Sequence, residues 1–378
     1  MDSVTQIVLG AAVGEVVLGK KLGNKAMLWG AIAGTIPDLD VYQSLFFDKL
    51  RANELHRGFS HSILFSIIFA PILAWFVSKR EKWTLSVLTT LIFAYPLIAN
   101  DSLVVRLVLG GIILLLNGII WLHDFSVLTA TKGDWTKLMF WSLITHPLLD
   151  CHTTWGTQLL WPLPYKLAWN NIFVLDPMYT VPFLVCVTVA LFFHRTNRLR
   201  GVFNWLGIAL SSSYMLWSLG VKWYTHEVFS TSLQNQNIEY SRITTVPTPM
   251  NTFLWSATAD ADSVYYVGLY SIFDKDKNVQ FDRVETNHYL LDSLQDEETL
   301  NRLYFLSKNW YVVREVDGAL VFNDARYGPM YKEDHQPLYG FGYRLEEKEG
   351  KLKVSQPEPD RSEMKPIFVR LWTRIWGK

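Results

Sequence analysis

Long apolar stretches are the feature that most limits what this chain can fold into. About 20 apolar residues cross the hydrocarbon core of a bilayer as a helix, and several segments among the first 224 residues approach that length. The runs Gly110–Leu122 and Val181–Phe193 are almost uninterrupted, whereas a helix of a soluble bundle keeps a polar face. The sequence therefore favours an integral membrane protein over a soluble helical bundle.

We expect about eight helices in this part, with six or seven spans as the alternative. The first and sixth helices are short, and the second carries Asp38 and Asp40. The expected helices cover residues 4–19, 26–47, 61–78, 84–100, 103–122, 136–150, 175–194 and 202–224. No cleavable leader pattern is visible, so we expect the first helix to be retained.

Basic residues between the helices predict the orientation. They form three clusters: Lys20, Lys21 and Lys25; Lys79, Arg80 and Lys82; Arg195, Arg198 and Arg200. With eight spans all three clusters fall on one side, which the positive-inside rule assigns to the cytoplasm. Residues 1–224 hold 17 basic and 12 acidic residues, whereas the remainder holds 18 and 23. We therefore expect an apolar, cationic membrane domain at 1–224 and an anionic domain on the outer side.

After Tyr224 the pattern is that of a water-soluble domain. Short segments rich in Val, Tyr and Phe, namely Ser263–Phe273, Asn309–Val316 and Ala319–Phe322, alternate with turn-forming residues and predict strands. Leu291–Leu306 predicts one amphipathic helix. The expected fold is a multi-span α-helical membrane bundle followed by a soluble α+β or mainly β domain at 225–360. The basic tail 361–378 has helical spacing and is expected either to lie on the membrane surface or to be a frayed end.

Three motifs in the membrane domain carry ionisable side chains. They are Pro37-Asp38-Leu39-Asp40, His56-Arg57-Gly58-Phe59-Ser60-His61 and His146-Pro147-Leu148-Leu149-Asp150. An ionisable side chain at membrane depth costs about 2.5–3.5 kcal/mol on insertion scales, so it persists where it is paired, hydrated or bound to metal. The expected orientation places all three motifs at the outer membrane boundary.

The residue types in these motifs are those of a metal site. Imidazole and carboxylate together suit zinc, manganese or iron, and the only cysteines, Cys151 and Cys186, cannot form a thiolate cage. His146 and Asp150 are four residues apart and share one helical face. His56 and His61 are too far apart for one face, so we expect a turn that pivots at Gly58, with Ser60 as the cap of the next helix.

Six side chains are candidate metal ligands: Asp38, Asp40, His56, His61, His146 and Asp150. This number exceeds the needs of one tetrahedral zinc with an open position, so either two ions bind or some candidates orient the others. We favour His56, His61, His146 and Asp150 as direct ligands. Asp38 and Asp40 are then expected to be a bridging ligand and a supporting residue or general base.

Two further residues are candidates for catalysis beside Asp40. Arg57 is suited to a phosphate oxygen because its planar fork makes bidentate contacts, although anchoring to lipid headgroups is an equal alternative. His152 is either an additional ligand or a proton donor to a leaving group, with a surface-loop role as the alternative.

The motifs P-D-L-D, H-R-G-F-S-H-S and H-P-L-L-D-x-x-T-x-x-G-x-x-L-L-W-P resemble those of the YdjM-type family. The resemblance covers residues 1 to about 224 and implies a bacterial inner-membrane, metal-dependent hydrolase. Many members begin M-D-x-x-T-H, whereas this chain has Gln6 at the histidine position. If that histidine is a ligand elsewhere, Gln6 removes one ligand here.

The sequence thus predicts a membrane-bound hydrolase that holds one or two divalent metal ions, with zinc favoured. A metal-activated water would cleave a lipid or lipid-linked phosphoester at the outer boundary. The alternatives are an intramembrane amide hydrolase, although H-E-x-x-H is absent from the sequence, and a metal-stabilised scaffold or transporter without activity. Membrane lipid and a protein partner for the C-terminal domain are the expected partners. Nucleic acid is not expected, because no basic tract is present.

Overall fold

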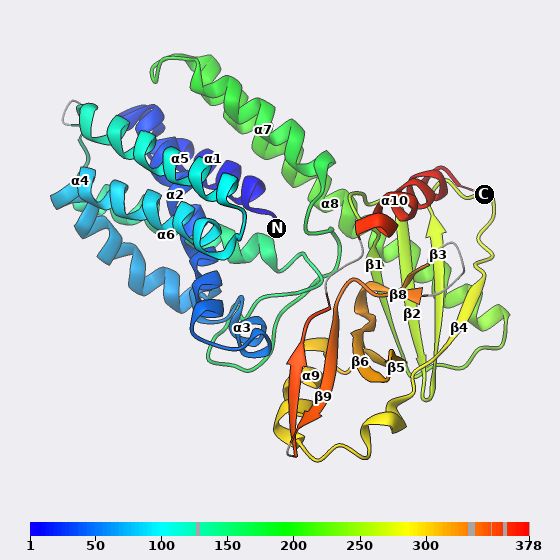
Figure 1. Cartoon of the computed structure of the whole chain (residues 1–378). Coiled ribbons are helices and arrows are strands. Elements are labelled where there is room, and N and C mark those ends of the chain that lie inside the picture. The colour runs from blue at the N-terminus through cyan, green and yellow to red at the C-terminus, as the bar shows by residue number, and fades with distance from the viewer. Residues whose placement is uncertain (126–128, 332–336, 349, 358–360, 378) are drawn as a thin grey trace. The chain divides into compact units, whose positions relative to one another are not determined.

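The computed structural model describes residues 1–125, 129–331, 337–348, 350–357 and 361–377, which form two compact units. The helical unit comprises Met1–Phe46, Leu55–Trp169 and Pro177–Tyr214. The sheet unit comprises Phe47–Glu54, Asn170–Asp176 and Met215–Lys378. The elements follow one another along the chain as labelled in Figure 1.

Helices build the first unit. They are α1 (Ser3–Leu22), α2 (Asn24–Thr35), the 3-10 helices η1 (Ile36–Leu45) and η2 (Phe59–His61), α4 (Ile63–Ala99), α5 (Leu103–Leu122), α6 (Lys132–Asp150) and α7 (Pro177–Leu191). The helix α8 (Arg198–Asn235) begins here and continues into the sheet unit, which also contains most of α3 (Lys49–Leu55).

The prediction of eight spans was wrong. Within the described ranges, α1, α4 and α5 are long and apolar enough to cross a membrane, and α7 is a shorter apolar helix of 15 residues. The expected helices at 61–78 and 84–100 are both present, as the two halves of α4 on either side of the non-helical residue Arg80. The expected helix at 26–47 divides into the 12-residue α2 and the 3-10 helix η1, because Pro37 cannot donate the backbone hydrogen bond that a regular helix needs.

Small residues bring α1 and α2 into close contact. A Cβ atom on Gly10 would lie 2.3 Å from the carbonyl oxygen of Gly30, and one on Gly14 would lie 2.2 Å from that of Ala26. Spacings of four between small residues allow helix backbones to approach in this way. The packing fixes the end of α2 beside the start of α1, where the candidate ligands follow.

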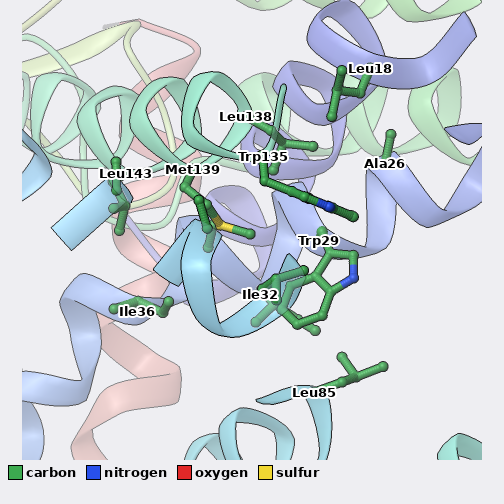
Figure 2. Packing of buried hydrophobic residues seen from close by; sticks show 14 of the residues in the cluster. Leu18, Ala26, Trp29, Ile32, Ile36, Leu85, Trp135, Leu138, Met139 and Leu143 are labelled. Carbon is green, nitrogen blue, oxygen red and sulfur yellow. The ribbon is translucent and has the colours of Figure 1, made fainter. Parts of the chain in front are cut away.

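The core of the helical unit gathers side chains from α1, α2, α4 and α6 (Figure 2). Trp29 and Trp135 are buried and meet edge to face, with ring centroids 5.9 Å apart. Such aromatic pairs contribute about 0.5–1.5 kcal/mol beyond the area that they bury. This contact holds α6 against α2 and so sets the position of the histidine at the other end of α6.

Two capping interactions fix where α4 and α6 begin. The side chain of Ser62, rather than the expected Ser60, accepts from the backbone of Phe65 and caps α4. At the start of α6, Thr131 and Asp134 form a reciprocal capping box, which satisfies two backbone donors at a helix N-terminus. Asp134 also pairs with Lys21 at 2.5 Å.

Two four-stranded antiparallel sheets form the sheet unit, which confirms the expected strands but was not itself predicted. The first has the order β1 (Arg242–Pro247), β2 (Leu254–Ala261), β3 (Val264–Ser271) and β4 (Phe281–Glu285). The second has the order β10 (Lys351–Ser355), β9 (Gly342–Lys348), β6 (Ala319–Asp324) and β5 (Tyr311–Val316). A short pair joins β7 (Met330–Tyr331) and β8 (Pro337–Leu338). The 3-10 helices η3 (His288–Leu291) and η4 (Ala325–Tyr327) and the helix α9 (Glu297–Ser307) complete the connections before the C-terminal tail.

The tail forms the helix α10 (Arg361–Ile375), as its spacing indicated. Ile367 and Ile375 are buried, and the guanidinium of Arg374 donates to both carboxylate oxygens of Asp274 at 2.6 and 2.5 Å. The alternative of a frayed end is therefore wrong. Trp372 lies on the exposed side of the helix, and the membrane-surface placement stays a prediction.

Candidate metal centre

The three motifs meet within the helical unit. Asp38 and Asp40 lie in η1, His61 lies in η2, and His146 and Asp150 lie in the last turns of α6. One ligand atom from each of Asp38, His61, His146 and Asp150 lies within 4.8 Å of the others. We call these four residues the ligand cluster.

Distances within the ligand cluster fit a single four-coordinate ion. The two imidazole Nε2 atoms are 3.1 Å apart, and each lies 3.4 Å from Asp38 Oδ1. Asp150 Oδ2 lies 3.3 Å from Nε2 of His146 and 3.5 Å from Nε2 of His61. Tetrahedral zinc with nitrogen and oxygen ligands at about 2.0–2.1 Å places neighbouring ligand atoms about 3.3–3.4 Å apart. The five distances given above, 3.1–3.5 Å, are therefore close to five of the six ligand-to-ligand distances in such a tetrahedron.

Each imidazole is oriented through its other ring nitrogen. Nδ1 of His146 lies 2.5 Å from the carbonyl oxygen of Gly34. Because a carbonyl oxygen can only accept a hydrogen bond, Nδ1 must carry the proton and act as the donor. Nδ1 of His61 lies 3.3 Å from Asp40 Oδ2 and 3.0 Å from the hydroxyl of Ser60. Such contacts fix the tautomer and leave Nε2 with a lone pair. Both lone pairs face the ligand cluster.

The two oxygens of Asp150 are in different environments. Oδ1 accepts from the amide of Gln6 at 3.0 Å and from the amino group of Met1. Oδ2 is buried and makes no hydrogen bond within the described chain, although it forms an ion pair with Arg57 Nε at 3.2 Å. A buried carboxylate oxygen without a hydrogen bond is costly. A cation in the ligand cluster would satisfy it, so these residues fit a metal ion.

Arg57 is buried at the edge of the ligand cluster. Its Nη1 donates to Thr153 Oγ1 at 2.7 Å, and its Nε lies 3.2 Å from Asp150 Oδ2. Arg57, and not the expected Gly58, is the residue with left-handed backbone, at φ 58°. Gly58 is required instead by space, since a Cβ there would lie 2.8 Å from the carbonyl oxygen of Leu55.

Besides Arg57, three of the candidate residues lie outside the ligand cluster: His56, His152 and Asp40. Nδ1 of His56 lies 2.9 Å from Asp40 Oδ1, and its side chain is 31% exposed. Burial lowers the pKa of His56, and the Asp40 carboxylate acts in the opposite direction. His152 is half-buried and packs its ring edge to face against Trp169, with centroids 4.4 Å apart. Asp40 joins His56 to His61 and accepts from the backbone of Arg57 at 2.9 Å.

Sequence reasoning missed three supporting groups: the amide of Gln6, the carbonyl of Gly34 and the hydroxyl of Thr153. The amide of Gln6 holds Asp150 through a hydrogen bond of 3.0 Å to Oδ1. The small-residue spacing of α1 and α2 is a signal that could have placed Gly34 near the first turns of α1. The contact between Thr153 and Arg57 depends on the turn after α6, and no spacing rule would have given it.

Comparisons with known proteins identify the helical part of the chain. A family profile described as "YdjM inner membrane protein" matches residues 1–227, which include every residue of the ligand cluster. No curated protein matches the chain. No solved structure matches it either. Since the profile covers more than half of the 378 residues, the chain belongs to the YdjM inner membrane protein family.

Proposed function

We propose that this protein is a membrane-bound, metal-dependent hydrolase that cleaves a lipid or lipid-linked phosphoester. The proposal rests above all on the ligand cluster, where two imidazoles and two carboxylates face one point and Asp150 Oδ2 lacks a hydrogen bond. Nitrogen and oxygen ligands without a thiolate are typical of hydrolytic zinc sites. A divalent ion held there would supply Lewis-acid chemistry, polarising an ester oxygen and acidifying water.

Access to the ligand cluster is uneven. The side chains of His61, His146 and Asp150 are at most 1% exposed, whereas Asp38 is 21% exposed. A substrate would therefore approach past Asp38. Asp38 is the ligand best placed to make room for it, since a catalytic site keeps one position for water or substrate.

Arg57 and His56 have separate roles in this proposal. The guanidinium of Arg57 is charged and lies beside Asp150, where it would bind a phosphoester oxygen. His56 is held through Nδ1 by Asp40, so its Nε2 would carry a proton to or from the reacting group. This assigns His56 to proton transfer instead of direct ligation.

The decisive experiment measures bound metal and hydrolysis of phospholipid and model phosphoesters on the same preparations. His61→Ala and Asp150→Ala should each lose metal and activity together, because each removes one of four ligands. Asp101→Ala is the matched control, since Asp101 is fully exposed, and it should keep both. A His61→Ala protein that folds and retains full metal content would contradict the proposed site.

Arg57 variants test the phosphoester separately from the metal. Arg57→Ala should keep the metal and lose turnover, and Arg57→Lys should recover only part of that loss, since a point charge cannot make the bidentate contact. If Arg57→Ala loses its metal, Arg57 instead serves to position the ligand Asp150 and does not bind the substrate.

A second candidate function is a metal-stabilised membrane scaffold without hydrolytic activity. The near-complete burial of three ligands favours it, because structural zinc sites are closed by four protein ligands. Under this alternative, metal removal should lower the unfolding temperature, and no lipid or model phosphoester should be turned over by the metal-loaded wild type.

A further inference from the structure

A large apolar groove runs along α2 in the helical unit. Its volume is about 1000 Å³, and it is lined from α1, α2, α4, α5 and α7, together with the residues that follow α5. The α2 side chains in its wall recur at helical spacing, from Asn24 and Leu28 to Ala31 and Thr35. The groove therefore follows one face of α2 from its first residue to its last.

The charged residues of the groove gather at one end, and its remaining polar residues are few: Asn24, Thr35, Thr89, Thr188 and His123. Lys25, His123 and Asp124 line the end near the start of α2, and Thr35 lines the other end. Aliphatic side chains such as Ile32, Ile92 and Leu184 line the wall between them. An apolar channel with polar ends fits a long hydrocarbon chain better than a soluble polar metabolite.

The Thr35 end adjoins the ligand cluster on two helices. On α2, Gly34 accepts from His146, and the next residue, Thr35, lines the groove. On α1, Gln6 donates to Asp150, and the next residue, Ile7, lines the groove. The groove thus begins one residue away from two groups that hold the candidate ligands.

The groove is long enough to hold one acyl chain. The 12 residues of α2 span about 17 Å at a rise of about 1.5 Å per residue. An acyl chain extends over about half of the hydrocarbon core, which is about 15 Å. Three of the helices in the wall, α1, α4 and α5, are the candidate membrane spans, and of α5 only Ile120 is buried. In a membrane these helices would be in contact with lipid hydrocarbon, which is therefore the occupant that fits the groove best.

We propose that the groove along α2 binds one acyl chain of a membrane lipid and thereby presents the lipid's ester or phosphoester to the ligand cluster. The use of the bound lipid as substrate rests on the proposed function, whereas its binding does not. An acyl chain along α2 would place its polar end beside Thr35 and its terminal methyl towards the Lys25 end. Cleavage should consequently depend on chain length, with short-chain phosphoesters turned over poorly.

The test uses the full-length protein in liposomes that contain phosphatidylglycerol with a photoactivatable diazirine midway along one acyl chain. After illumination, labelled peptides are mapped by mass spectrometry, with and without prior chelation of metal. Labelling should concentrate on α2 and on the stretch from Leu184 to Leu191, and it should survive chelation. Labelling spread evenly over the exposed face of α5 would overturn the proposal.

Groove-filling variants make the test specific. Ala31→Phe places an aromatic ring in the groove. If the ring displaces only two methylenes of the bound acyl chain, the affinity of the groove for the chain, and with it the labelling of α2, should fall by about tenfold. Ala209→Phe is the matched control, because Ala209 is exposed on α8 and does not line the groove. Equal labelling in both variants would contradict the proposal. If Ala31→Phe fails to fold, Ala11→Phe, which fills the same groove from α1, takes its place.

Failure of the groove and failure of the enzyme are distinguishable. If the protein binds the acyl chain but hydrolyses nothing, labelling persists and the proposed function fails alone. If it hydrolyses short-chain and long-chain phosphoesters equally and labelling is diffuse, the groove proposal fails alone.

Discussion

At the scale of single residues, the metal centre is an arrangement of tautomers and lone pairs. The sequence predicted that His146 and Asp150 share a face, and their side chains approach to 3.3 Å. Asp38, which the sequence placed beside them as a bridging ligand or supporting residue, lies with them in the ligand cluster. The position of His56 could not be predicted, because the left-handed backbone of Arg57 turns His56 towards Asp40. A spacing of five residues does not reveal which residue takes that conformation.

Asp40 supports the centre, and its charge should matter more than its size. It contacts the Nδ1 atoms of His56 and His61 and accepts from the backbone of Arg57. We expect Asp40→Asn to weaken metal binding by about 10–100-fold, the usual effect of losing a support of this kind, with the fold retained. Competition with a metal-binding dye measures this, and the exposed Asp101→Asn is the control. Unchanged affinity in Asp40→Asn would remove Asp40 from the site.

At the scale of elements, the apolar pattern located most helices. The bounds of α5 coincide with the expected helix at 103–122, because both of its ends lie at polar residues. The helices expected at 61–78 and 84–100 are both present within α4, on either side of the non-helical residue Arg80. The basic residues there marked the interruption correctly, because they break the apolar run. In the sheet unit, strand pairing depends on contacts distant in sequence, so the sequence predicted the strands and not the sheet order.

The start of α6 provides a test by pH. At this end of α6, Asp134 accepts a hydrogen bond from Lys21 and further hydrogen bonds from Thr131. These contacts lower the pKa of Asp134 to about 2. A carboxylate whose pKa is lowered on folding stabilises the folded state fully at pH values above its pKa in the unfolded chain, which is about 4 for Asp. This stabilisation is lost as the pH falls from about 4 towards the folded-state pKa of about 2. Asp134→Asn should therefore lower the unfolding temperature at pH 7, and the difference from wild type should shrink between about pH 4 and pH 2. A difference that is independent of pH would assign the effect to the cap geometry alone.

At the scale of the whole molecule, the helical unit is polarised. The basic clusters meet at one end, where Lys25 pairs with Glu81 at 2.8 Å and Arg195 donates to the carbonyl of Lys21 at 3.0 Å. The ligand cluster lies at the other end of α1 and α2, beside Gln6 and Gly34. This separation holds whatever the number of spans. By the positive-inside rule, we propose that the basic end faces the cytoplasm and the ligand cluster faces outward.

Reporter fusions test this orientation. A reporter that is active only outside the cytoplasm, fused after residue 378, should be active, because we expect α8 to cross the membrane from the basic end before the chain enters the sheet unit. A reporter placed between α1 and α2, beside Lys21, should show the cytoplasmic pattern. Cytoplasmic activity at both positions would contradict the orientation and place the sheet unit inside the cell.

The central claim is that Asp38, His61, His146 and Asp150 hold one divalent metal ion. X-ray absorption spectroscopy of the metal-loaded, full-length protein tests it most directly. We expect stoichiometric metal with a nitrogen and oxygen shell at about 2.0–2.2 Å, outer scattering from two imidazoles and no sulfur. Cys151 directly follows Asp150 in the sequence. A sulfur shell at about 2.3 Å, or a folded protein that retains no metal, would contradict the claim.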